Sequence, residues 1–163
     1  MVEPISITTK ELTNQRIVYI RMRGSYAEFR KQSRHLFKEL FAFATENKLI
    51  VPESTKVLTI YDDNPFITDE KKLRTSVAMT IPYEAKVVES GNICVSSISG
   101  KFGVGRFNIS ASQYGEAWRY MYQEWLFKGK GTSRDAPPFE MYITEPPKKL
   151  TEKSLTDIYL PIL

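Results

Sequence analysis

Cysteine and histidine are almost absent from this sequence of 163 residues, which contains one of each, Cys94 and His35. A single cysteine excludes an internal disulfide framework. Zinc sites take several Cys or His ligands, so we expect no metal, and we expect no cofactor either. Nucleophilic chemistry needs a partner base within reach, so we predict that neither Cys94 nor His35 carries function.

Long hydrophobic runs and a secretion signal are also missing. The apolar runs are far shorter than the roughly 20 residues that a membrane helix needs. The N-terminus lacks the basic head and apolar core of a signal peptide. Hydrophobic residues make up 42% of the chain and charged residues 26%, as is usual in soluble globular proteins. We therefore expect one cytoplasmic domain over residues 1–163, with no membrane partner.

Charge of one sign is not concentrated anywhere in the chain. The net charge of +4 comes from 23 basic residues that are interleaved with 19 acidic ones. The densest basic pieces are short, such as Lys71–Lys72, and no helix-turn-helix pattern or RNA-binding aromatic motif accompanies them. We predict a mildly basic solvated surface and no direct binding to DNA.

The sequence does contain an internal repeat, with halves at about residues 5–82 and 91–162. Each half predicts a strand of alternating apolar residues, a helix with one apolar face and two further strands. The predicted ranges are 16–23, 27–47, 56–61 and 73–81 in the first half, and 103–109, 114–127, 137–142 and 155–160 in the second. Two more strand-like pieces, 5–8 and 92–97, precede the repeats.

Matching residues support the repeat, because Tyr26 corresponds to Tyr114 and Tyr61 corresponds to Tyr142. Each β-α-β-β unit is too small to bury the apolar face of its own helix. We therefore predict an α+β fold with pseudo-twofold symmetry, in which two helices cover one antiparallel sheet. The natural place for a ligand cleft is between the two helices.

Three glycines in the second half, Gly100, Gly103 and Gly105, superficially suggest a phosphate-binding loop. A dinucleotide fingerprint would need a further glycine at Asn108 and a strand that leads directly into a helix. We interpret the glycines as a bend in a strand.

Glu140 is the most unusual charged residue, because it falls in the middle of the strand Phe-Glu-Met-Tyr. Side chains alternate along a strand, so Glu140 and Tyr142 should share one face. Its repeat partner is Thr59, and symmetry therefore does not require a carboxylate here. Such a carboxylate needs a counter-charge or a ligand. The alternative is that it faces water or pairs with Arg106 or Arg74.

Aromatic residues are abundant at 12% of the chain and allow two interpretations. Large aromatic side chains often simply fill a core. Around one carboxylate, they are also the composition of a pocket for a cationic aromatic ligand. The residues concerned are Trp118, Tyr122 and Trp125 on the second helix, and Tyr61, Tyr142 and Tyr159 in the strands.

Six ordered motifs resemble one known family. They are Arg-Gly-x-Tyr at 23–26, Ile-Tyr-Asp-Asp-x-Pro at 60–65, Lys-Leu-Arg at 72–74, Trp-x-x-x-Tyr-x-x-Trp-Leu at 118–126, Pro-x-Phe-Glu-x-Tyr at 137–142 and Ile-Tyr-Leu-Pro-Ile at 158–162. Over about residues 5–162, the chain resembles the GyrI-like small-molecule-binding domains of the SOUL/GyrI-like superfamily. These also serve as effector-binding domains of AraC-type bacterial transcription regulators.

The resemblance implies a cleft in which Glu140 faces hydrophobic cationic compounds, as in multidrug-binding members. The aromatic walls of that cleft carry over to Tyr61, Trp118, Trp125, Tyr142 and Tyr159. One departure is Ser112-Gln-Tyr114, where the family usually has Gly-x-Tyr, so we expect a distorted start of the second helix. We also expect a stand-alone domain, without the helix pair that binds DNA in larger members.

Three functions remain open at this stage. The leading hypothesis is a module that binds hydrophobic, cationic small molecules through Glu140 and the aromatic walls. The second is a hydrolase of strained electrophilic natural products, in which Glu140 acts as general acid or base with the help of Tyr142 or Tyr61. The third is a protein-interaction module resembling gyrase inhibitors, with DNA gyrase or a regulator as its partner.

Overall fold

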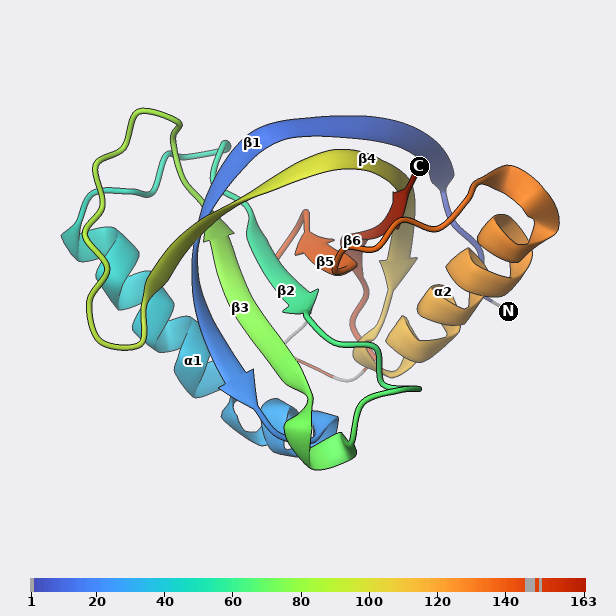
Figure 1. Cartoon of the computed structure of the whole chain (residues 1–163), viewed down its shortest axis with the longest axis horizontal. Helices are drawn as coiled ribbons and strands as arrows, with labels where there is room; N and C mark the ends of the chain where they lie inside the picture. The colour runs from blue at the N-terminus through green and yellow to red at the C-terminus, as the bar shows by residue number, and fades with distance from the viewer. Residues whose placement is uncertain (1, 146–148, 150) are drawn as a thin grey trace. The chain divides into compact units, whose positions relative to one another are not determined.

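The computed structural model describes residues 2–145, 149 and 151–163, which fold into two compact units (Figure 1). We call residues 13–99 the N-terminal unit, and residues 1–12 together with 100–163 the C-terminal unit. Both units combine antiparallel strands with one main helix, so the predicted α+β fold is confirmed. In the described part of the chain, no helix is long and apolar enough to cross a membrane.

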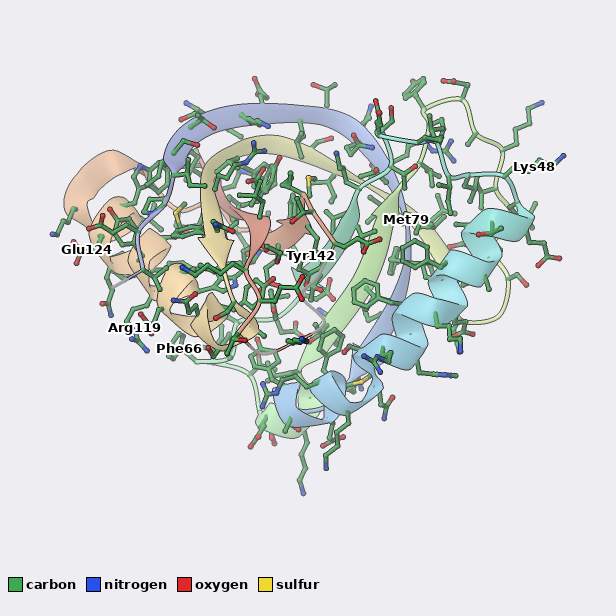
Figure 2. All side chains as sticks on the ribbon, turned by 180° about the vertical axis from the view of Figure 1, so that it is seen from behind. Lys48, Phe66, Met79, Arg119, Glu124 and Tyr142 are labelled. Carbon is green, nitrogen blue, oxygen red and sulfur yellow. The ribbon has the colours of Figure 1, made fainter. Side chains whose placement is uncertain are left out.

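The N-terminal unit is a β-α-β-β arrangement with its last strand in the middle. Its elements are β1 (Ser6–Arg23), α1 (Tyr26–Glu46), β2 (Val57–Tyr61) and β3 (Arg74–Thr80). Both β1 and β2 pair antiparallel with β3, so that Met79 lies opposite Val18 on one side and Val57 on the other. Helix α1 lies beside these strands, and Met79 projects from β3 on the side where α1 lies (Figures 1 and 2).

A glycine and a serine begin α1 where the sequence predicts a turn into a helix. Gly24 takes a φ of +150°, a conformation that other residues rarely adopt. The Ser25 side chain then accepts the backbone N–H of Glu28 at 3.1 Å, which satisfies one of the free donors of the first turn. The predicted helix at 27–47 is confirmed to within one residue at each end.

The C-terminal unit repeats the same order, as the internal repeat predicts. Its elements are β4 (Cys94–Ile109), a 3₁₀ turn η2 (Ala111–Gln113), α2 (Tyr114–Tyr120), a π-helical segment η3 (Met121–Lys130), β5 (Phe139–Tyr142) and β6 (Ser154–Ile162). Strand β6 pairs antiparallel with both β4 and β5. Strands β2 and β5 therefore hold equivalent places, each at the side of the strand that follows it.

The two strand-like pieces predicted separately at 5–8 and 92–97 are parts of longer strands. The first lies largely in β1 and the second largely in β4. Each long strand contains one residue with positive φ, Asn14 at 47° and Gly100 at 109°. Such a residue changes the direction of the backbone locally while the strand continues. The prediction of separate strands is therefore wrong.

The second helix is less regular than its predicted range of 114–127 suggests. The three-residue turn η2 precedes it, held by the Ser110 N–H, which donates to Gln113 Oε1 at 2.9 Å. After Tyr120 the turns widen into η3, and the buried positions become Ala117, Met121 and Leu126. Their spacing changes from four to five residues, because a π turn bonds residue i to i+5. The expected distortion at the start of the helix is thus present.

Gly103 and Gly105 serve helix packing rather than a strand bend. A Cβ atom on Gly103 would lie 2.1 Å from the Trp125 ring, and one on Gly105 would lie 2.4 Å from the Met121 sulfur. Neither glycine has a positive φ, so what they provide is space for the helix side chains. Among the three glycines, the bend interpretation applies to Gly100 only.

Candidate functional site

Glu140 lies in β5 on the face that packs against the second helix. It pairs with Ile158 across the β5–β6 ladder, and Ile158 belongs to the core that also holds Ala117 of α2. Tyr142 shares this face, as the alternation of the strand predicts. Only 5% of Glu140 is exposed, so the carboxylate is a buried acidic group at the helix–sheet interface.

Two neutral donors hold the carboxylate of Glu140. The indole N–H of Trp118 donates to Oε1 at 2.6 Å, and the hydroxyl of Tyr142 donates to Oε2 at 2.9 Å. Hydrogen bonds to a carboxylate stabilise its ionised form, but they do not cancel its charge. The two bonds also fix the carboxylate between helix and strand, so that its negative charge has a defined position.

Glu140 does not face water, and the two arginines named as its partners pair with other carboxylates. The first point follows from its burial. Arg106 instead pairs with Asp157, with Nε 2.8 Å from Oδ1, and Arg74 pairs with Asp63, with Nη2 2.8 Å from Oδ1. Both arginines that the sequence offered as partners are therefore engaged elsewhere.

Aromatic rings continue from Trp118 along the helix. The Trp118 and Tyr122 ring centroids are 6.3 Å apart at an interplanar angle of 25°, and Tyr122 lies 6.0 Å from Phe127. Burial raises the pKa of Tyr122, so its hydroxyl stays neutral at physiological pH. Phe127 is 73% exposed. The row of rings thus connects a buried carboxylate to an aromatic side chain in solvent.

Tyr114 extends the polar side of the site. Its hydroxyl lies 3.0 Å from Thr156 Oγ1, and Thr156 is the cross-strand neighbour of Tyr142. Burial raises the pKa of Tyr114, and the negative charge of Glu140 raises it further. Tyr114 is not among the site residues predicted from the sequence, and its match with Tyr26 in the repeat is the sequence signal at this position.

Two of the expected wall residues make contacts with residues other than Glu140. The Trp125 ring packs over Gly103, farther along the helix. Tyr159 faces the opposite side of the sheet, because it pairs with Phe139, the residue before Glu140. Its ring stacks on Phe139 with centroids 4.4 Å apart, and burial raises the pKa of its hydroxyl.

Tyr61 belongs to the N-terminal unit and meets an aromatic neighbour there. Its ring centroid lies 5.6 Å from that of Tyr26, the first residue of α1, in an edge-to-face contact. Thr59, the repeat partner of Glu140, is 2% exposed on the same strand. The predicted ligand cleft between the two helices stays a prediction.

A metal ion would need a group of ligating side chains close together among the described residues. Among them, no group of three or more His, Cys, Asp or Glu side chains is placed to hold a metal ion. The chemistry that the site supports is that of one buried carboxylate, two tyrosine hydroxyls and stacked aromatic rings.

Comparison with known proteins identifies the family of the chain. The sequence model of the family described as GyrI-like small molecule binding domain matches residues 5–163. A comparison with curated proteins found no match.

Solved structures with the same fold have low sequence identity. The C-terminal domain of EcmrR is 18% identical with a TM-score of 0.72, covering 97% of each chain. In the EcmrR–DNA complex, at 17% identity and a TM-score of 0.73, 96% of the present chain matches and spans 57% of the EcmrR chain.

Two further structures carry different descriptions. SAV2435 bound to tetraphenylphosphonium is 14% identical with a TM-score of 0.61, covering 98% of this chain and 94% of that one. A hydrolase from Listeria innocua is 11% identical with a TM-score of 0.64, covering 96% and 91%. At these identities the likeness shows the fold alone.

Proposed function

The chain belongs to the GyrI-like small molecule binding domain family, and from this premise we propose that it binds hydrophobic cations through Glu140. The observation that carries the proposal is the buried carboxylate held by Trp118 and Tyr142. A buried carboxylate held in place by an indole N–H and a tyrosine hydroxyl offers a cation a fixed acidic group in a poorly hydrated place, where electrostatic attraction is stronger than in water.

The aromatic rings beside Glu140 favour a cation that is also hydrophobic. Trp118 and Tyr122 present stacked π-faces next to the carboxylate. A cation over such a ring gains about 0.5–2 kcal/mol per contact, and burial of apolar surface adds to this. SAV2435, which shares the fold, has been solved with tetraphenylphosphonium, a cation enclosed by four phenyl rings. This supports the same ligand class here.

Titration calorimetry with tetraphenylphosphonium tests the proposal. Glu140→Gln keeps the shape of the side chain and removes its charge, so affinity should fall by about 1.5–3 kcal/mol. The matched control is Glu152→Gln, which removes an exposed carboxylate from the same unit and should bind as wild type. Equal affinities of wild type and Glu140→Gln would contradict the proposal.

Hydrolysis is the second candidate function, and the contact between Tyr142 and Glu140 favours it. A hydroxyl 2.9 Å from a buried carboxylate is a donor–base pair that general acid–base catalysis can use. Glu140 would take a proton from a water molecule whose oxygen bonds to a carbon of the strained ring, while the ring C–O bond breaks and Tyr142 protonates the released oxygen. The proton on Glu140 would then return to Tyr142 across their hydrogen bond. The hydrolase from Listeria innocua has the same fold.

Incubation with an epoxide, followed by mass spectrometry of the products, separates the two functions. Diol formation that is lost in both Glu140→Gln and Tyr142→Phe would establish a hydrolase. Saturable binding of tetraphenylphosphonium without any turnover of epoxides would leave the binding function alone.

A further inference from the structure

A pocket of about 480 Å³ is lined only by residues of the N-terminal unit, and none of its lining residues contacts Glu140 in the interactions described above. Its walls come from three segments: the middle of β1, the loop 51–55 after α1 and the segment 80–84 after β3. The loop follows the end of α1, close in sequence to Lys48, which Figure 2 labels. The volume suits a small metabolite or a compact acid.

Arg16 supplies the positive charge of this pocket. Its Nη1 donates to the backbone carbonyls of Tyr83 and Ala85, which anchors the guanidinium against the segment after β3. In the described part of the chain, no carboxylate forms an ion pair with Arg16. In a half-buried guanidinium that carbonyls hold through Nη1, the Nε and Nη2 hydrogens remain to bind an acceptor.

Two threonines of the lining also have hydroxyl hydrogens to donate. Thr55 Oγ1 accepts the Val51 N–H at 2.8 Å, and Thr80 Oγ1 accepts the Lys56 N–H at 2.7 Å. A hydroxyl whose oxygen already accepts a backbone N–H has its own hydrogen to offer. Both side chains line the pocket, so its donors include two hydroxyls and one guanidinium.

Donors that converge beside an unpaired cationic group are the chemistry of oxyanion recognition. We propose that this pocket binds the oxyanion group of a small molecule, a carboxylate or a phosphate, with Arg16 as the charged anchor. Glu84 also lines the pocket and is exposed, so it opposes an anion from the rim. The ligand class is opposite in charge to the hydrophobic cation proposed for Glu140, and the two proposals stand independently.

Amide chemical shifts of the full chain, titrated separately with inorganic phosphate and acetate, test the site. The backbone amides of residues 51, 53–55, 80–81 and 83–84 should shift saturably with at least one of the two anions and not with chloride at equal ionic strength. The anion that saturates first identifies whether phosphate or carboxylate is preferred. Shifts that are scattered over the basic surface of α1, or that chloride reproduces, would overturn the proposal.

Two exposed positions give variants that leave the buried contacts of Arg16 intact. Ser54→Asp places a negative charge in the lining and should weaken binding about tenfold. Ser96→Asp, which adds the same charge outside the pocket, is the control for net charge. Unchanged binding in Ser54→Asp would overturn the proposal.

Glu84→Gln should have the opposite effect, because it removes the like charge at the rim. We expect binding to tighten by about threefold, since a rim charge is partly screened by solvent. Unchanged or weaker binding in this variant would count against the pocket. Glu140→Gln should bind either anion as wild type does, so that failure of this proposal and failure of the cation proposal remain distinguishable.

Discussion

In the N-terminal unit, β1 faces α1 with Val18 and Ile20, whereas the equivalent positions of β4 in the C-terminal unit are Gly103 and Gly105. The space above the glycines is occupied from the helix side, by Trp125 and Met121. At this interface, the large side chains therefore come from the strand in the N-terminal unit and from the helix in the C-terminal unit. A repeated fold can keep the same helix–sheet spacing when large and small residues exchange places between the helix and the strand.

The same comparison at the opposite strand separates a structural position from a functional one. Thr59 of β2 and Glu140 of β5 hold equivalent places, and the helix residues four positions after Tyr26 and Tyr114 are Arg30 and Trp118. Only the C-terminal unit combines a carboxylate with an indole donor. The repeat thus supplies a common frame, and one half of it carries the proposed charge site.

The largest expected effect comes from filling the glycine side of the helix–sheet interface. Gly103→Val copies Val18 of the N-terminal unit, but its side chain would overlap the Trp125 ring. We expect the free energy of unfolding to fall by about 3 kcal/mol, measured by urea denaturation.

The control is the double variant Gly103→Val with Trp125→Ala, compared with each single variant. Removing the ring should restore part of the lost stability, so the two substitutions should couple by about 1 kcal/mol or more. Strictly additive effects would show that the stability of this interface does not depend on a small residue at position 103 facing a large one at position 125.

An intermediate effect is expected at the helix position beside the carboxylate. Trp118→Phe keeps an aromatic ring but removes the N–H that donates to Glu140, so unfolding free energy should fall by about 1–3 kcal/mol. Arg30→Ala, at the equivalent exposed position of α1, should change it by less than about 0.5 kcal/mol. A similar loss of unfolding free energy in both variants would show that the two equivalent helix positions do not differ in their structural role.

The smallest effect lies in the turn after β2. Arg74 lowers the pKa of Asp63 below the ordinary value of 3.8 through a side-chain hydrogen bond. An aspartate with a lowered folded-state pKa stabilises the protein above its unfolded pKa, and this is lost as pH falls through the folded-state pKa. Arg74 is 39% exposed, so solvent screens the pair, and Asp63→Asn should cost about 0.5–1 kcal/mol at neutral pH.

Thermal unfolding at two pH values checks this prediction. The gap in Tm between wild type and Asp63→Asn should be present at neutral pH and should close when the pH is well below 3.8. A gap that persists in acid would mean that the turn is held by something other than the ionised pair.

The periodic pattern of apolar residues predicts most of this fold, because burying one face of each strand or helix requires apolar residues at regular intervals. The helix starting at Tyr26 and the equivalence of β2 and β5 follow directly from such patterns. The π-helical turns of η3 do not, because their five-residue spacing between Met121 and Leu126 resembles an irregular α-helix pattern. The role of Gly103 is also invisible without the ring that packs over it.

The sequence predicts part of the candidate site for a similar reason. Alternation places Glu140 and Tyr142 on one face, and the resemblance to the family adds Trp118. The position of Tyr159 depends on the β5–β6 register, which pairs it with Phe139 and turns it to the opposite face. Register is a tertiary property, and alternation within one strand cannot determine it.

The central claim is that the charge of Glu140 selects cationic ligands, and one pair of ions tests it directly. Tetraphenylphosphonium and tetraphenylborate share nearly the same shape and apolar surface but have opposite charges. Calorimetry should show that wild type prefers the phosphonium by a factor of about ten or more, and that Glu140→Gln loses most of this preference. If both proteins discriminate equally between the two ions, the carboxylate of Glu140 does not select the ligand.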